Sequence, residues 1–203
     1  MSKLIFMGMN DSSLSSSSMT FRSFWPWLIL GLLVQASMWM WGQMHQEGPL
    51  EAIRYAARYS GRFSFLSFLA SVLFLTQWGG DPQKWQRAFT ASVFFAWVHL
   101  LHFGYLAANL SWNHIEPEVP KAIGGGLAYL TLVFHPRALM TRRWKHGFHA
   151  FYVYFVGLVM ALTFVARIRG EFPGAAPSGF HFVGIAAVAL AWLAFTKKRF
   201  FQR

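Results

Sequence analysis

The sequence of 203 residues contains no cysteine and little charge. The absence of cysteine excludes disulfides, zinc–thiolate sites, iron–sulfur clusters and covalent attachment of a c-type haem. Charged residues make up 12% of the chain, whereas soluble proteins carry about 25%. Seven acidic residues are too few to cover a water-facing surface, so most of the surface must face something other than water.

Long apolar runs explain this shortage of charge. A membrane-spanning helix needs about 20 mostly apolar residues. Six stretches approach that length: 24–42, 62–79, 88–110, 121–139, 147–168 and 179–196. We therefore expect an all-α polytopic membrane protein, a bundle of about six transmembrane helices formed by residues 24–203. The Ser-rich residues 1–23 are expected to form a disordered or surface-lying tail.

Two segments carry more detailed expectations. Residues 49–60 have apolar and basic residues at helical spacing, which predicts a short interfacial helix on the outer side. Three successive glycines, residues 124–126, open the fourth stretch and are expected to allow close backbone approach within the bundle.

The net charge of +11 comes from basic residues at the ends of the apolar runs, not from a continuous stripe. This distribution argues against a nucleic-acid partner and fits anchoring against membrane lipid. If both termini and the loops 80–87 and 137–146 share one side, that side holds twelve basic residues and the other holds six. The positive-inside rule then places both termini in the cytoplasm.

Histidines are the best candidates for chemistry, because no acidic residue falls inside a predicted span. His99 lies within the third stretch, and His102 follows three residues later on the same helix face. His146 and His149 repeat this spacing at the start of the fifth stretch, and His135 lies near the inner end of the fourth. Neutral imidazoles in a helical bundle suit metal ligation, above all axial ligation of haem iron.

Neighbouring residues fit this interpretation without requiring it. The aromatic and small residues that suit a flat macrocycle are Phe95, Ala96, Phe103, Ala150 and Gly157. The basic residues expected to neutralise haem propionates at the cytoplasmic face are Arg137, Arg142, Arg143 and Lys145. Interhelical hydrogen bonding by the imidazoles and lipid contact by the aromatic rings stay open as alternatives. His45, His114 and His181, at the outer side, are expected to be polar surface.

Several short segments resemble, in their order, the ferric-reductase-like transmembrane superfamily over roughly residues 49–203. The segments are Pro49-Leu50-Glu51-Ala52-Ile53 with Ser60-Gly61-Arg62, Trp85-Gln86-Arg87 before Phe95 to Leu100, Arg142-Arg143-Trp144 before His149 to Val153, and the basic tail from Lys197. Within this superfamily the chain most resembles the haem-binding membrane subunits of bacterial methionine-sulfoxide reductase systems.

The resemblance implies one or two b-type haems held between helices, in a multi-pass protein of the bacterial inner (plasma) membrane. It implies that His99 is the ligand on the third helix and His149 the inner ligand on the fifth. The superfamily has a second histidine further along the fifth helix, where this chain has none between Val159 and Phe164. One ligand that the resemblance implies is therefore missing.

The depths of the histidines leave the ligand pairing open. At about 1.5 Å per residue, His99 lies roughly 18 Å from Arg87, whereas His149 lies about 6 Å from Lys145. His99 and His149 are therefore not expected to share one iron, and His149 is closer in depth to His135. His99 or His102 would pair with Met160 or leave the iron five-coordinate; loss of the haem is a further alternative.

These observations favour a b-type cytochrome that carries electrons across or within the membrane, as an electron-transfer subunit of a membrane oxidoreductase. The chain has no G-x-G-x-x-G motif and no room for a flavin or nicotinamide domain, so it needs a redox partner protein or larger membrane complex, with a quinone or flavin as donor. The alternative is a non-catalytic accessory or scaffold subunit without haem. Missing intramembrane carboxylates and repeats disfavour a transporter.

Overall fold

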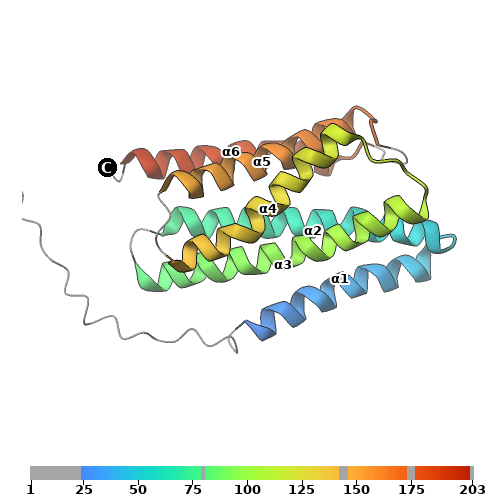
Figure 1. Ribbon diagram of the computed structural model, residues 1–203, viewed down its shortest axis with the longest axis horizontal. Coiled ribbons are helices and arrows are strands. Elements are labelled where there is room, and N and C mark those ends of the chain that lie inside the picture. The colour runs from blue at the N-terminus through green and yellow to red at the C-terminus, as the bar shows by residue number, and fades with distance from the viewer. Residues whose placement is uncertain (1–23, 79–80, 142–145, 173–176, 202–203) are drawn as a thin grey trace, which may run out of the picture.

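The computed structural model describes residues 24–78, 81–141, 146–172 and 177–201, which form six helices and no strands. The helices are α1 (Trp25–His45), α2 (Pro49–Gln77), α3 (Pro82–Trp112), α4 (Val119–Thr141), α5 (His146–Ile168) and α6 (Gly179–Phe201). The beginning of α1 and the end of α6 lie at the same end of the bundle (Figure 1). The prediction of an all-α bundle of six helices is confirmed.

Four of the described helices, α2, α3, α5 and α6, are long and apolar enough to cross a membrane. Large hydrophobic side chains on these helices are exposed, among them Leu66, Leu73 and Leu190, as expected for a surface that faces lipid. Four tryptophans and two glutamines make α1 less apolar, and the three glycines, Lys121 and Pro136 do the same for α4. Crossing of the membrane by α1 and α4 therefore stays a prediction.

The expected interfacial helix at residues 49–60 is wrong, because this segment forms the first three turns of α2. Ala52, Ile53 and Ala56 are buried there rather than exposed to a membrane surface. The helix continues without a break through Gly61, so the predicted short helix and the second predicted span are one helix. A Cβ on Gly42 would lie 3.0 Å from the Ala52 carbonyl oxygen, so α1 packs against this part of α2 at backbone distance.

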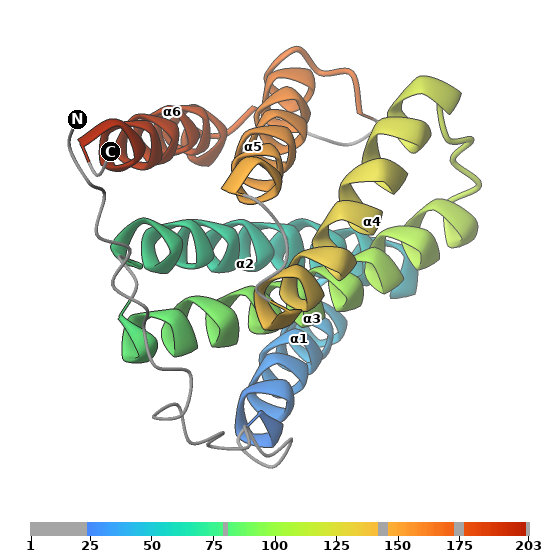
Figure 2. The same cartoon turned by 60° about the vertical axis from the view of Figure 1, so that its left-hand side comes forward.

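Helices α2 and α3 form the centre of the bundle, with α1 on one side and α5 and α6 on the other (Figure 1). Helix α4 slants across the bundle between α3 and α5, as Figure 2 shows. Phe68, Phe95 and Tyr152 are fully buried where α2, α3 and α5 meet. Aromatic side chains therefore fill the interior at mid-depth, and they separate the two ends of the bundle.

The expectation that Gly124, Gly125 and Gly126 permit close helix approach is wrong, since a Cβ on each would meet no atom within 4 Å. Close approach occurs at other glycines. A Cβ on Gly184 would lie 2.5 Å from the Phe164 ring, and one on Gly157 would lie 2.7 Å from the Trp192 indole nitrogen. The fourth helix is slightly longer than the predicted stretch 121–139. Helix α4 continues through Pro136 to Thr141, although a proline removes one backbone hydrogen bond.

Candidate functional site

A stripe of buried serines on α2 organises the polar contacts inside the bundle. Its members recur at helical spacing, so they lie along one face: Ser60, Ser64, Ser67 and Ser71. The hydroxyl groups of Ser60, Ser64 and Ser71 meet side chains of α3 and α5, including two of the predicted histidines. The sequence analysis missed this stripe. Its signal is the i, i+4, i+7, i+11 spacing of serines in an otherwise apolar segment.

His102 on α3 is held by Ser60. The Ser60 hydroxyl donates to the Ala57 carbonyl at 3.1 Å, so at His102 its oxygen acts as acceptor for the Nδ1–H, at 2.8 Å. This assignment places the proton on Nδ1 and the lone pair on Nε2. The ring also lies against the backbone of Gly61, where a Cβ would come within 3.0 Å of His102 Cε1. A side chain at residue 61 would therefore require the imidazole to move by a few tenths of an ångström.

His99, one turn earlier on α3, has a similar anchor. Its Nδ1 lies 2.5 Å from the Ser64 hydroxyl, and its ring stacks on Tyr129 of α4 with centroids 4.5 Å apart. In the described part of the chain, its Nε2 has no hydrogen-bond partner. Engagement of one ring nitrogen by a polar neighbour is the usual way in which a metal-ligating histidine is oriented. His99 therefore has the arrangement expected of a ligand that binds through Nε2.

The second pair of histidines lies toward the opposite end of the bundle. His135 of α4 and His149 of α5 are both buried, and His135 Nε2 lies 3.1 Å from His149 Nδ1. The two rings meet edge to face, and Trp78 lies at the edge of His149 with centroids 6.0 Å apart. The predicted proximity of His149 to His135 is confirmed. No contact joins His149 to His99 in the described residues.

His135 is the most deeply enclosed of these imidazoles. It stacks on Tyr152 with ring centroids 3.6 Å apart and an interplanar angle of 3°. Its Nδ1 is buried without a hydrogen-bond partner, in the part of the chain that the structure describes. A buried polar atom without a partner costs about 1–3 kcal/mol. Burial of His135 Nδ1 is therefore unfavourable, and the packing of the ring alone does not explain why a histidine lies here.

Aromatic rings connect the two histidine pairs through the bundle. Ring centroids are separated by 5.3 Å from His99 to Phe95, 5.5 Å from Phe95 to Phe68 and 6.3 Å from Phe68 to Tyr152, which in turn stacks on His135. The Tyr152 hydroxyl lies 3.3 Å from that of Ser71. We call the rings of Phe95, Phe68 and Tyr152 the aromatic column. It is continuous from one histidine pair to the other, and its three members are fully buried.

The structure places the other predicted site residues differently. The side chain of His146 and the whole of residues 142–145, which include Arg142 and Arg143, lie outside the described residues. The prediction that His45 and His114 lie on the surface is confirmed. The same prediction is wrong for His181, which is buried and accepts a hydrogen bond from the Ser178 backbone N–H at 3.2 Å. Within the described part of the chain, no group of three or more His, Cys, Asp or Glu side chains gathers as a metal site.

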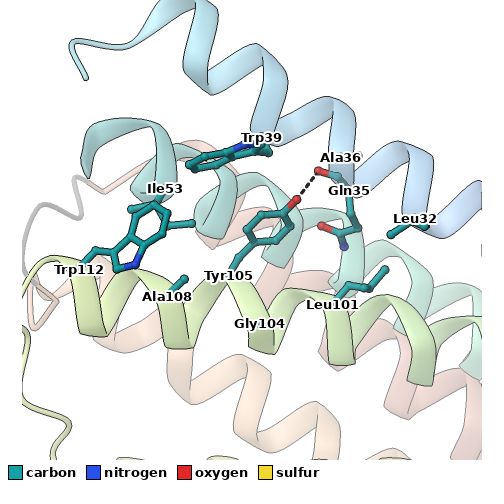
Figure 3. A pocket seen from close by; sticks show the side chains of 10 residues that line it. All are labelled: Leu32, Gln35, Ala36, Trp39, Ile53, Leu101, Gly104, Tyr105, Ala108 and Trp112. Carbon is teal, nitrogen blue, oxygen red and sulfur yellow. Dashed lines mark hydrogen bonds between the residues drawn. The ribbon is translucent and has the colours of Figure 1, made fainter. Parts of the chain in front are cut away.

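A cavity of about 380 Å³ lies apart from the histidines, on the other side of α3 and next to α1. Figure 3 shows its aromatic walls, Trp39, Tyr105 and Trp112. Gln35 lies in this wall, and its Oε1 is buried without a partner among the described residues, while its Nε2 donates to the Val98 carbonyl at 3.3 Å. The Tyr105 hydroxyl donates to the backbone carbonyl of Gln35 at 2.9 Å. The cavity is apolar and has one unused acceptor.

Comparisons with known proteins neither support nor contradict the resemblance noted from the sequence. No family model, no curated protein and no solved structure matches the chain. The function must therefore be inferred from the arrangement of the residues themselves.

Proposed function

We propose that this chain is a b-type haem protein of the membrane, which carries electrons across or within the membrane to a partner. The observation that carries the proposal is the placement of two histidine pairs at two depths, the outer one partly buried and the inner one buried, joined by the aromatic column. Ionisable side chains inside a membrane bundle are costly and usually functional.

The donor set fits haem iron at the outer pair. His99 and His102 are anchored through Nδ1 by serine hydroxyls, so that Nε2 is the ring nitrogen left for a metal. His99 is the better ligand of the two, because the Gly61 backbone lies against the His102 ring. The stacked Tyr129 fixes the orientation of the His99 ring.

The inner pair fits haem in only one way. His135 Nε2 lies 3.1 Å from His149 Nδ1, so these two nitrogens form a hydrogen bond with each other and would not both bind one metal ion. His149 would instead bind through Nε2 while His135 holds its Nδ1, which repeats the anchoring seen at His99. His149 would thus be the inner ligand and His135 its positioning residue.

A bound haem would supply the one-electron couple, and the chain would provide the ligands and a dry surrounding. Ser60 would hold the proton of the His102 imidazole on Nδ1, and Ser64 would orient the His99 ring through its Nδ1. Phe95, Phe68 and Tyr152 would exclude water between the two pairs and keep them at fixed separation. We propose bacterial inner-membrane localisation and a redox partner protein on the same grounds.

A quinol is the electron donor that the cavity beside α1 supports. Its apolar and aromatic walls suit a flat ring, and Gln35 Oε1 would accept a hydrogen bond from a quinol hydroxyl. The volume of about 380 Å³ falls in the range of small-molecule pockets, about 300–1,000 Å³. Gln35→Leu should then raise the quinol concentration needed for half-maximal haem reduction.

The experiment that tests the proposal is the dithionite-reduced minus oxidised absorption spectrum of the purified protein, expressed with added haem. A b-type α-band that is lost in the His99→Ala, His149→Ala double variant supports the proposal. A colourless, folded wild-type protein contradicts it and favours an accessory subunit, in which the same serine and histidine contacts only hold helices together.

A further inference from the structure

The cavity beside α1 has one polar end, formed by Gln35 and Tyr105. Gln35 is 1% exposed, and its Oε1 has no hydrogen-bond partner in the described part of the chain. Figure 3 shows this oxygen on the side of the amide that faces the Tyr105 ring. A buried acceptor without a partner is costly, and a donor that reaches it removes the cost. This end of the cavity therefore favours a ligand that brings a donor.

The orientation of the Gln35 amide is set by its nitrogen. Nε2 donates to the backbone carbonyl of Val98 at 3.3 Å, and that oxygen can only accept. A turn of the amide by half a rotation would bring two acceptors together and lose this hydrogen bond. Oε1 is therefore the amide atom that stays toward the cavity.

The Tyr105 hydroxyl is also committed as a donor, because it bonds the backbone carbonyl of Gln35 at 2.9 Å. Toward a ligand its oxygen can then act only as an acceptor. Trp39 and Trp112, whose indole N–H groups are donors, lie further along the cavity from the Gln35 side chain (Figure 3). At its Gln35 end the cavity therefore presents acceptors to a ligand.

We propose that the cavity selects aromatic rings that carry a hydroxyl group, and so binds a quinol in preference to the corresponding quinone. A quinol hydroxyl donates to Gln35 Oε1, whereas a quinone carbonyl can only accept and would face Oε1 with no proton between them. A site that hydrogen-bonds a hydroxyl group rejects the analogue without it, because the buried group of the site is left unpaired. The inference rests on the quinol donor of the proposed function, but it does not require haem.

The test is equilibrium dialysis of the detergent-purified full chain with two probes, para-propylphenol and para-propylfluorobenzene. The two rings are similar in shape and differ in the hydroxyl group, and dialysis of detergent without protein corrects for partition into micelles. We expect the wild type to bind the phenol about tenfold more tightly, as one hydrogen bond of about 1.4 kcal/mol would give. Equal binding of the two probes, or binding of neither, overturns the proposal.

Matched variants locate the preference. Gln35→Leu should bind both probes equally, whereas Gln43→Leu, at an exposed position of the same helix, should keep the tenfold preference. Leu101→Trp fills the cavity from α3 and should weaken the binding of both probes, while Gln35 and its hydrogen bond stay in place. A preference that persists in Gln35→Leu, or unchanged binding in Leu101→Trp, contradicts the proposal.

The quinol and quinone themselves are compared in the His99→Ala, His149→Ala double variant, so that no ligand is oxidised by haem. Durohydroquinone should bind this variant more tightly than duroquinone, and the reverse order contradicts the proposal. Failure of this inference differs from failure of the proposed function. A protein with the b-type α-band but without the phenol preference refutes only the selectivity of the cavity, whereas a colourless protein with the preference refutes only the haem.

Discussion

The two histidine pairs use different anchors. The outer imidazoles, His99 and His102, are each held at Nδ1 by a serine of α2. The inner ligand candidate, His149, is held at Nδ1 by a second imidazole, His135, which leaves a buried nitrogen unpaired. A serine hydroxyl can both donate and accept, so Ser60 bonds its own helix and the imidazole of His102 at once. The difference indicates that the outer pair depends on the packing of α2 against α3, whereas the inner pair depends on the packing of α4 against α5.

The largest effect is expected within the outer pair itself. His99→Ala should remove the outer site and weaken the b-type α-band, because its Nδ1 is anchored by Ser64 and its Nε2 has no hydrogen-bond partner among the described residues. His102→Ala should keep most of the band, because the Gly61 backbone restricts that ring. The reduced-minus-oxidised spectrum distinguishes the two variants. A larger loss in His102→Ala would show that we have assigned the outer ligand wrongly.

The next largest effect concerns the stability of the inner pair. His135→Ala removes a fully buried ring that stacks on Tyr152, so the free energy of unfolding should fall by about 2–4 kcal/mol. His45→Ala, on the exposed end of α1, is the control and should change stability by less than about 0.5 kcal/mol. Denaturant unfolding of both variants measures the difference. Equal stability of the two would refute the view that His135 is a packing element of the inner pair.

A smaller effect is expected at the close contact beside His102. Gly61→Ala places a Cβ 3.0 Å from the imidazole, and relief of this contact should cost about 1–3 kcal/mol. Gly125→Ala, with no atom within 4 Å, should instead stabilise the protein by about 0.5–1 kcal/mol through helix propensity. Thermal unfolding should therefore shift in opposite directions. A shift in the same direction would mean that His102 does not pack on α2 as described.

The smallest effect isolates a single anchor. Ser64→Ala leaves His99 Nδ1 without its hydroxyl partner and should cost about 1 kcal/mol of stability. It should also shift the reduction potential of the outer haem, because the basicity of the ligand changes. Ser67→Ala is the control, since among the described residues the Ser67 hydroxyl bonds only the Phe63 carbonyl. An equal reduction potential in both variants would show that Ser64 does not influence the ligand His99.

Much of the fold was predictable because apolar runs and Gly–Pro breaks report directly on helices in a membrane. The start of α2 was mispredicted because Arg54 and Arg58 suggested a surface, although Ala52 and Ala56 pack against α1. The glycines of α4 were mispredicted because local sequence does not show which glycines meet another helix.

The candidate site was predictable only in part. His99, His135 and His149 were identified because they interrupt apolar segments, and the depth argument correctly brought His149 near His135. Their anchors lie 14 to 35 residues away along the chain, so they required the tertiary structure.

The central claim is that the bundle holds haem at two depths, through His99 and His149. Its most direct test is the haem-to-protein ratio from the pyridine haemochrome assay, on wild type and on His99→Ala and His149→Ala, with His45→Ala as control. We predict that each ligand variant loses one of the two sites while the control loses none. Equal ratios in all four proteins, or no haem in the wild type, would contradict the claim.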